Sequence, residues 1–385
     1  MDRLSALFGA DEKTTVIEGQ GCIQQLAGLC SNWKARRVLV VSDPGVVAAG
    51  HAGQVMQILA GSGIVCELFA EVNENPSTED VDRGFAPALA FQPDAIVAVG
   101  GGSAIDVAKG VDFLLSCGGR MQDYWGPNKA TNPLLPIIAI PTTAGTGSEV
   151  QSFALIIDPL SHQKMACGDP SAAPRFALLD PELSLSMPRR VSACTGIDTL
   201  GHAVESAVSL PRNAISSAYS REAFRLTSSH LERVLEEPSA LDARAGMLRA
   251  AAMAGFAIEH SMLGAAHSLA NPLSAHLGLP HGEAVGLALP VVVEWNGELD
   301  EIAAIYAELL AAAGIEATAQ PGRRLAGYLR DLLQAADMPV QMSELRDGSL
   351  LAILAAEASK QWTAQFNPRP VDVPALTQLL RALAA

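Results

Sequence analysis

Residues 94–106, DAIVAVGGGSAID, carry the pattern that decides the fold of the first half of the chain. An apolar run leads into three glycines, and a helix-like stretch continues from Ser103 to Ser116. This order predicts a buried strand, a tight turn and a helix. Similar apolar runs occupy 37–43 and 135–142, and helix-like stretches occupy 51–62 and 77–90. Strands that alternate with helices predict an α/β fold, in which a parallel sheet is covered on both faces.

The second half of the chain has a different pattern. Beyond about Pro188, Ala/Leu-rich periodicity predicts helices over 191–209, 214–236, 242–260, 299–313, 323–336, 350–361 and 374–384. A chain of 385 residues exceeds what one hydrophobic core usually supports. We therefore predict an α/β domain over 1–187 and an all-helical domain over 188–385, with the functional site in the cleft between them.

Composition and charge exclude several classes of function. The formal net charge of −15 disfavours binding to nucleic acid or to anionic lipid. No stretch offers the run of about 18 apolar residues that a membrane helix needs, and the N-terminus lacks the pattern of an export signal. The six cysteines are scattered without CxxC spacing, as is typical of reduced thiols. We expect a globular cytoplasmic protein that binds neither nucleic acid nor membrane.

Two loops of small residues follow predicted strands at the same edge of the sheet. In Gly100-Gly-Gly-Ser103, the glycines let a phosphate approach the backbone closely, and the following helix N-terminus favours an anion. The same letters also suit a plain strand-to-helix turn, and the spacing matches neither GxGxxG nor GxxxxGK[ST]. The second loop, Pro141–Glu149, is rich in hydroxyl groups. Together the two loops suit a dinucleotide better than a single phosphate.

Asp43 ends the first of the three predicted strands. A carboxylate at this position can accept hydrogen bonds from both hydroxyls of an adenosine ribose and repels a 2′-phosphate, which favours NAD over NADP. The alternative is that Asp43 caps the turn or helix that Pro44 begins.

Four residues of the second half could hold a metal ion. Asp198 and His202 are four residues apart, so a helix places both on one face, although such a pair alone is more often a surface ion pair. His267 and His281 lie in a small, apolar segment, where buried imidazoles need either ordinary hydrogen bonds or a metal. We predict that Pro272 and Pro280 prevent a continuous helix between these two histidines, so that the chain can return. One carboxylate and three imidazoles suit a divalent Lewis-acid site.

Motifs along the whole chain resemble those of the iron-containing, or group III, alcohol dehydrogenases. The motifs are Gly100-Gly-Gly-Ser-x-x-Asp-x-x-Lys109, Pro141-Thr-Thr-Ala-Gly-Thr-Gly-Ser-Glu149, Asp198-x-x-x-His-Ala-x-Glu205, His267 and Pro280-His-Gly282. The resemblance begins at Glu18-Gly-Gln-Gly21 and extends to Asn367-Pro-Arg-Pro370. Each motif is weak alone, but their order and separations together form a specific pattern.

The resemblance implies a dehydroquinate synthase-like fold, with an NAD(P)-binding domain and a helical catalytic domain that forms a homodimer. It implies hydride transfer between NAD(H) and a small alcohol or aldehyde, with NADP the less favoured cofactor and Fe²⁺ or, alternatively, Zn²⁺ as the metal. The implied metal ligands are Asp198, His202, His267 and His281. The implied cofactor contacts are Asp43, Asn75, Gly101, Gly102, Ser103, Asp106, Thr142, Thr143, Thr146 and Lys164. The predicted catalytic residues are His267, His281 and Asn271.

The sequence also departs from this family. Asn271 stands where many members have a second histidine, and Phe153 stands where some alcohol-specific members have a polar residue. Three other functions therefore stay open. They are a metal-independent reductase of the maleylacetate reductase type, a dehydroquinate-synthase-like cyclase, and a non-enzymatic NAD-binding protein. The few Lys and Arg residues around 250–285 count against the cyclase, and the four aligned ligand residues count against a non-enzymatic protein.

Overall fold

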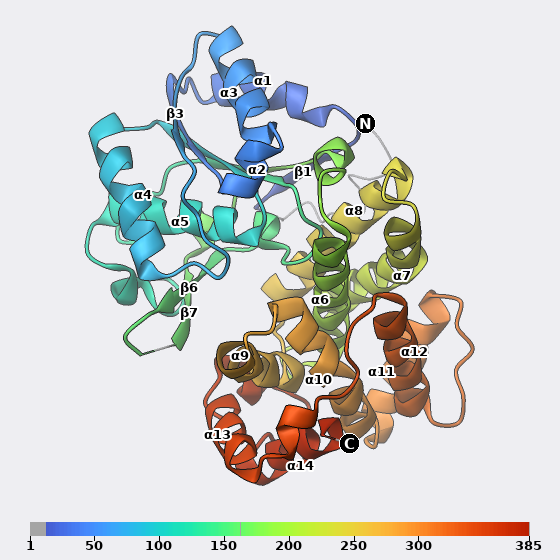
Figure 1. Cartoon of the computed structure of the whole chain (residues 1–385). Coiled ribbons are helices and arrows are strands. Elements are labelled where there is room, and N and C mark those ends of the chain that lie inside the picture. Colours follow the sequence, from blue (N-terminus) through green and yellow to red (C-terminus); the bar gives the residue numbers. More distant parts are fainter. Residues whose placement is uncertain (1–12, 162, 385) are drawn as a thin grey trace. The chain divides into compact units, whose positions relative to one another are not determined.

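The computed structural model describes residues 13–161 and 163–384, which form two compact units (Figure 1). The first unit runs to Thr143 and resumes over Gly147–Met187. The second unit comprises Ala144–Thr146 and the chain from Pro188 onward.

The first unit is built on a six-stranded sheet in which every pair of neighbours is parallel. Across the sheet the strands are β1 (Thr15–Glu18), β8 (Phe176–Leu179), β5 (Ile137–Pro141), β4 (Ala95–Gly100), β2 (Arg37–Val41) and β3 (Val65–Phe69). The strands expected from the sequence are β2, β4 and β5, which are neighbours. Their carboxyl ends therefore share one edge of the sheet, and the loops that follow them lie together.

Helices cover both faces of this sheet, which confirms the predicted α/β class. Side chains alternate along β2, so Val38 and Val40 pack with α1 (Leu26–Asn32) and α3 (His51–Gly61), whereas Leu39 and Val41 pack with α4 (Thr78–Phe91) and α5 (Gly102–Cys117). Figure 1 shows α4 and α5 on one side of the strands and α1 and α3 on the other. The remaining short helices of the unit are η1 (Cys22–Gln25), α2 (Pro44–Ala48), η2 (Met121–Tyr124), η3 (Ser148–Val150), η4 (Pro170–Ala172) and η5 (Pro181–Ser184).

A two-stranded antiparallel hairpin completes the first unit. It consists of β6 (Phe153–Asp158) and β7 (Gln163–Gly168), with Ile156 opposite Met165. The sequence analysis did not predict this hairpin, because β7 begins with polar residues and an apolar run as short as β6 does not by itself distinguish a strand from a helix. Its inner side chains, such as Ile156, join the core on the α4–α5 face.

The second unit contains no strand among its described residues, which confirms the all-helical prediction. Its helices are α6 (Arg189–Val208), α7 (Ala214–Glu236), α8 (Leu241–Glu259), α9 (Ala265–Leu277), α10 (His281–Asn296), α11 (Asp300–Ala312), α12 (Pro321–Ala335), η6 (Ser343–Arg346), α13 (Gly348–Ala358), η7 (Trp362–Phe366) and α14 (Val373–Leu383). Helix α6 is buried almost throughout from Gly196 to Val208, and it packs against α7, α8 and α10.

The prediction about Pro272 was wrong. Pro272 lies inside α9 and is buried, so it does not break the helix. A proline inside a helix costs one backbone hydrogen bond, and the packing of a buried helix face can offset that cost. The break between His267 and His281 comes at Gly278, whose φ of +66° ends α9, and at Pro280, the N-cap residue of α10, which begins at His281.

Asp112, on α5, provides a test of the first unit's core. Its carboxyl group is fully buried and accepts hydrogen bonds from Leu135 N and Ser116 Oγ. Burial raises the pKa of Asp112 to about 7. The folded protein therefore keeps this proton at pH values where the unfolded chain has released it, so Asp112 lowers stability as pH rises through this range.

The Asp112→Asn variant is expected to lose this part of the pH dependence, because an amide stays neutral. Between pH 5 and pH 8, the free energy of unfolding of the unmodified protein should fall by roughly 2–4 kcal/mol more than that of the variant. Urea unfolding of both proteins at the two pH values measures this difference. If the free energies of unfolding of the two proteins change equally with pH, Asp112 is ionised in the folded protein.

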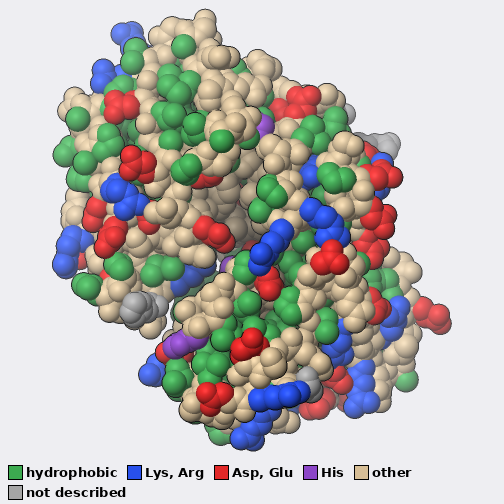
Figure 2. All heavy atoms as spheres, viewed as in Figure 1, with side chains coloured by type: hydrophobic (Ala, Val, Ile, Leu, Met, Phe, Trp, Pro, Cys, Tyr) green, Lys and Arg blue, Asp and Glu red, His purple; other side chains and the backbone are tan. Residues whose placement is uncertain are grey.

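The surface carries charges of both signs. Figure 2 shows Lys and Arg side chains interspersed with Asp and Glu on the viewed face. Within the second unit many of these form ion pairs, such as Arg233 with Asp242 at 2.5 Å and Arg369 with Glu298 at 2.7 Å. Among the helices that the structure describes, none combines the length and the apolar character needed to cross a membrane.

Candidate functional site

Three acidic or imidazole side chains share one face of α6. Asp198, His202 and Glu205 follow helical spacing, and all three are buried. Gly201 lies beside them, and a β-carbon there would be 2.6 Å from Val285 Cγ1 and 3.3 Å from His267 Cε1. Glycine at this position therefore lets α9 and α10 approach α6 closely.

One oxygen of Asp198 is the centre of the candidate metal site. Its Oδ1 lies 3.4 Å from His202 Nε2, 3.4 Å from His267 Nε2 and 3.8 Å from His281 Nε2. The donor atoms of Asp198, His267 and His281 all lie within 4.8 Å of one another. The His202 ring stacks on that of His267, with 4.9 Å between centroids. The structure thus brings together three of the four predicted ligands with donor atoms close enough for one ion, and His202 joins them through its approach to Asp198.

The donor atoms themselves fit a metal ion better than a hydrogen-bonded cluster. Asp198 Oδ1 and His267 Nε2 are buried, and neither has a hydrogen-bond partner with acceptable geometry among the described residues. Buried polar atoms without partners are costly unless they bind something else. One carboxylate oxygen and three imidazole nitrogens form a mixed O/N set that Fe²⁺ and Zn²⁺ both accept.

Mutual electrostatics show how strongly these groups interact. Burial alone would raise the pKa of Asp198, but the facing imidazoles hold it well below its usual range. Burial lowers the pKa of His202 to about 4, against the attraction of Asp198. Burial also opposes protonation of His267, but Asp198 and Glu205 outweigh it and raise the pKa of that imidazole to about 9. The Asp198 carboxylate therefore stays ionised, and its negative charge favours a positive charge among the surrounding imidazoles.

Glu205, to which the sequence analysis assigned no role, contacts the candidate ligand His267. Its Oε2 lies 2.5 Å from His267 Nδ1, and its two oxygens accept hydrogen bonds from the backbone N–H groups of Ala266 and His267. A carboxylate on Nδ1 fixes the tautomer that leaves Nε2 as a ligand. The signal was present in the sequence, because Glu205 continues the helical spacing of Asp198 and His202.

The predicted cofactor residues of the first unit gather at the carboxyl edge of the sheet. Gly100 has a φ of +155°, and a β-carbon there would lie 2.8 Å from Ala104 Cβ and 3.0 Å from Asp43 Oδ2. Thr142 N donates to Gly100 O at 2.9 Å, which ties the two loops together. A β-carbon at Gly101 would lie 3.3 Å from Thr143 Oγ1. This edge is therefore narrow and lined by small residues.

The other predicted cofactor residues occupy several environments. Asp43 is the N-cap of α2, and its Oδ1 accepts a hydrogen bond from Val46 N at 3.0 Å. One of its two oxygens therefore caps a helix, as the alternative to ribose binding predicts. Gly102 and Ser103 form the first turn of α5, and Asn75, with a φ of +52°, is exposed between β3 and α4. Thr146 belongs to the second unit.

Asp106 lies in a buried polar group behind the loops, whereas Lys164, on β7, is only half-buried. Asp106 accepts a hydrogen bond from Ser148 Oγ, and its carboxyl lies 3.9 Å from Lys109 Nζ. Lys109, fully buried, donates to Ser148 O and to Phe153 O, both at 2.8 Å. The charge of Lys164 also acts on Asp106. These contacts fix the loop that follows Thr146.

Comparisons with known proteins agree with this geometry. The family model "Iron-containing alcohol dehydrogenase" matches residues 13–181, and "Fe-containing alcohol dehydrogenase family, C-terminal" matches residues 192–384.

The chain belongs to the iron-containing alcohol dehydrogenase family.

Individual relatives support the same assignment. Alcohol dehydrogenase 4 of Schizosaccharomyces pombe is 35% identical over 278 residues, which cover 72% of this chain and 66% of the relative. The structure of a 1,3-propanediol oxidoreductase superposes with a TM-score of 0.91 at 29% identity, covering 96% of this chain and 97% of that one. A sulfoacetaldehyde reductase from Bifidobacterium kashiwanohense in complex with NAD⁺ superposes with a TM-score of 0.88 at 26% identity, covering 98% of each chain.

These findings confirm that the protein is an oxidoreductase of the iron-containing alcohol dehydrogenase family. They also confirm the predicted fold class, which combines an α/β domain with a helical domain.

Two further polar side chains of α9, those of Asn271 and His276, have partners of their own. Asn271 lies one turn beyond His267, is half-buried, and donates from Nδ2 to Gln361 Oε1 at 2.9 Å. His276 is exposed, and its Nε2 lies 2.9 Å from Glu357 Oε2. His276 therefore has a hydrogen-bond partner of its own and is not one of the candidate ligands.

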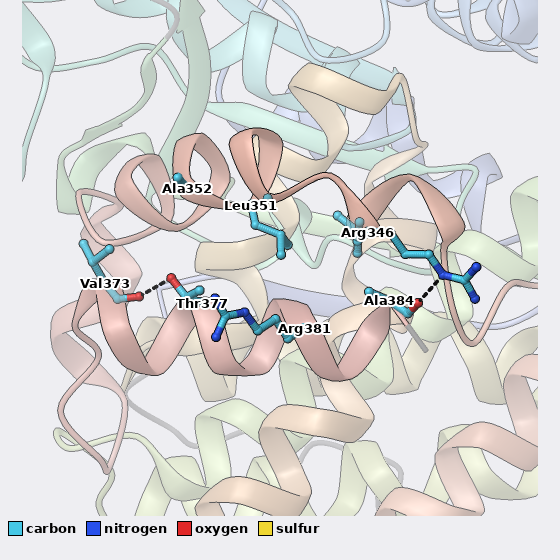
Figure 3. Close-up of a pocket in the computed structure, with 9 residues that line it drawn as sticks. Arg346, Leu351, Ala352, Val373, Thr377, Arg381 and Ala384 are labelled. Carbon is cyan, nitrogen blue, oxygen red and sulfur yellow. Dashed lines mark hydrogen bonds between the residues drawn. The ribbon is translucent and has the colours of Figure 1, made fainter.

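A cavity of about 490 Å³ lies elsewhere in the helical unit, between α13 and α14 (Figure 3). Arg346 and Arg381 stand at its wall, and Arg346 Nε donates to Ala384 O at 3.2 Å. None of the four candidate ligands lines this cavity. It is therefore separate from the metal cluster.

Proposed function

We propose that Asp198, His202, His267 and His281 hold one divalent ion, Fe²⁺ in the first place and Zn²⁺ as the alternative, at which a small alcohol or aldehyde reacts. The observation that carries this proposal is that two buried donor atoms, Asp198 Oδ1 and His267 Nε2, lie 3.4 Å apart while neither makes a hydrogen bond within the described part of the chain. When bound, NAD(H) supplies or accepts the hydride and the metal acts as a Lewis acid toward the substrate oxygen.

The side chains of the helical unit prepare this site. Asp198 stays ionised and provides the negative charge that balances a cation. Glu205 holds the Nδ1 proton of His267, so that Nε2 remains a ligand. The side chain of His281 is 23% exposed, against 5% for His267. We therefore place the substrate on the His281 side of the cluster.

We assign Asn271 to the substrate side as well, since it lies one helical turn beyond His267. Its amide does not titrate, so it can orient a hydroxyl or carbonyl group but cannot relay a proton. Gln361 holds it in place through the hydrogen bond to Asn271 Nδ2.

We propose that the narrow edge of the sheet binds NAD. The contacts would come from Asp43, Asn75, Gly101, Gly102, Ser103, Asp106, Thr142, Thr143, Thr146 and Lys164. The lack of room for a side chain at Gly100, and the limited room at Gly101, support a close approach of phosphate to the backbone. One oxygen of Asp43 caps α2, and its other oxygen, beside Gly100, is the proposed acceptor for the ribose.

The Asp43→Ser variant is expected to accept NADP. Serine is also a good N-cap, so the variant retains the cap of α2 while it loses the charge that repels a 2′-phosphate. Because like charges in contact cost several kcal/mol, kcat/KM for NADPH should rise at least about 10-fold relative to that for NADH. Steady-state assays with both cofactors measure this ratio. If the ratio of the two kcat/KM values and the stability both stay unchanged, Asp43 does not contact the cofactor.

The function itself is tested by stripping the metal and restoring it. The full-length enzyme is treated with a chelator, assayed with NADH and a panel of small aldehydes, and assayed again after addition of Fe²⁺ or Zn²⁺. We expect activity to disappear and return. Full activity after stripping would instead support a metal-independent reductase of the maleylacetate reductase type.

We further infer, from the resemblance and from the scattered free cysteines, that the enzyme works as a homodimer in the cytoplasm. Light scattering coupled to gel filtration tests the dimer. Fractionation of the native cells tests the location.

A further inference from the structure

The motif Asn367-Pro-Arg-Pro370 has no role in the function described so far, yet Asn367 is buried at the metal-binding end of α9. Its Oδ1 accepts from Ala265 N at 3.3 Å and from Asn296 Nδ2 at 3.0 Å. Its Nδ2 donates to Asn296 Oδ1 at 3.0 Å and to Arg369 O at 2.9 Å. A buried amide with its donors and acceptor all engaged is rigid, because any movement would leave a polar atom without a partner.

Arg369 fastens this motif to the end of α10. Its guanidinium carbon lies 4.1 Å from the centroid of the Trp295 ring, and its Nη1 donates to Trp295 O and to Glu298. Trp295 precedes Asn296, the last residue of α10. The motif and the end of α10 are thus joined by a cation–π contact, an ion pair and a reciprocal amide pair.

The first turn of α9 has no cap of its own. Its N-cap is Gly264, which has no side chain to accept from the free N–H groups of the turn. Instead, Asn367 Oδ1 accepts from Ala265 N, and Glu205 accepts from Ala266 N and His267 N. A β-carbon at Gly264 would lie 2.9 Å from Asn367 Oδ1 and 3.1 Å from Glu205 Oε1. Glycine is therefore required so that two distant side chains can reach this turn.

The turn held in this way carries His267. Glu205 sets the direction of the imidazole through Nδ1, but the position of the His267 backbone depends on the whole turn. With the turn in place, His267 Nε2 lies 3.4 Å from Asp198 Oδ1. A shift of the turn would move Nε2 away from the other donors.

We propose that Asn367 and Asn296 are positioning residues for the metal ligand His267: their amide pair fixes the first turn of α9 at the metal cluster. This inference rests on the proposed metal site. It predicts that loss of either amide weakens metal binding beyond what a loss of general stability would do.

The test is a titration of the chelator-treated, full-length protein with Co²⁺, followed by visible absorption. NAD⁺ affinity and the urea midpoint are measured on the same samples. Asn367→Ala should bind Co²⁺ about 10- to 100-fold more weakly, as typically follows loss of an outer-shell partner, with NAD⁺ affinity unchanged. Asn296→Ser, a milder change that leaves Asn367 in place, should weaken Co²⁺ binding about 10-fold and serves if Asn367→Ala does not fold.

The matched control is Leu380→Ala, a truncation of a fully buried residue on α14 outside the amide network. It should lower the urea midpoint and leave Co²⁺ affinity unchanged. Unchanged Co²⁺ affinity in a folded Asn367 or Asn296 variant would overturn the inference. The His267→Ala variant distinguishes a failure of this inference from a failure of the proposed metal site. If it does not reduce Co²⁺ binding, the proposed metal site itself is wrong.

Discussion

Replacement of His267 by alanine is expected to weaken binding of the catalytic metal by more than about 100-fold and to lower kcat by about 10³-fold. The variant loses a donor atom 3.4 Å from Asp198 Oδ1 and leaves the buried Glu205 without its imidazole partner. The affinity for NAD⁺ should stay unchanged, because the proposed cofactor residues belong mainly to the first unit. Metal analysis, turnover and NAD⁺ titration are measured on one preparation.

The control for this prediction is His276→Ala on the same helix. His276 pairs with Glu357 at the surface, and such pairs contribute only about 0–1 kcal/mol. This variant should keep its metal and its turnover. If His267→Ala does not fold, His281→Ala replaces it, since His281 is more exposed. Retention of metal and turnover in either ligand variant, or an equal loss of NAD⁺ affinity, would contradict the assignment.

Replacement of Gly282 by alanine is expected to remove the metal as well, because it disturbs the packing of two helices. A β-carbon at this position would lie 2.0 Å from Cys194 O and 2.6 Å from Cys194 C, which are backbone atoms of α6. Helices α6 and α10 must therefore separate, and His281, the neighbouring residue, moves away from Asp198. We expect a loss of about 3 kcal/mol or more in free energy of unfolding, together with loss of metal. Thermal unfolding and metal analysis measure both.

The matched variant is Gly327→Ala on α12. No atom lies within 4 Å of a β-carbon at Gly327, so the same substitution meets no obstacle there. Because alanine is the better helix former, this variant should be stabilised by up to about 1 kcal/mol. Equal effects of the two substitutions would mean that α6 and α10 are not in close contact at Gly282.

Much of the fold could be predicted because its signals are local. The strands β2, β4 and β5 are short apolar runs followed by small residues, and the helix α5 begins directly after the glycines. Most helices of the second half follow from periodicity. The strands β1, β3, β6, β7 and β8 and the helices α9 and α10 were missed. A short apolar run such as β6 does not by itself distinguish a strand from a helix, and the prolines inside α9 and α10 give local signals that tertiary packing overrides.

In the candidate site too, some residues could be predicted from local sequence and others could not. Asp198 and His202 could be paired from the sequence because one helix fixes their spacing, and His267 and His281 were selected as chemically suitable partners. Glu205 was overlooked as a partner of His267, although its spacing on α6 was visible. Nothing local indicated that Asn367 would reach the first turn of α9, which is 102 residues away in the chain.

The sequence by itself indicated many of the elements, the division into an α/β and a helical half, and the side chains proposed as metal ligands, because backbone propensity and side-chain chemistry are properties of short segments. Only the tertiary structure decided that these side chains meet at one oxygen of Asp198 and that Glu205, Asn296 and Asn367 hold them there. Such convergence depends on the close packing of α6, α9 and α10, which glycines at 201, 264 and 282 permit and which no short segment specifies.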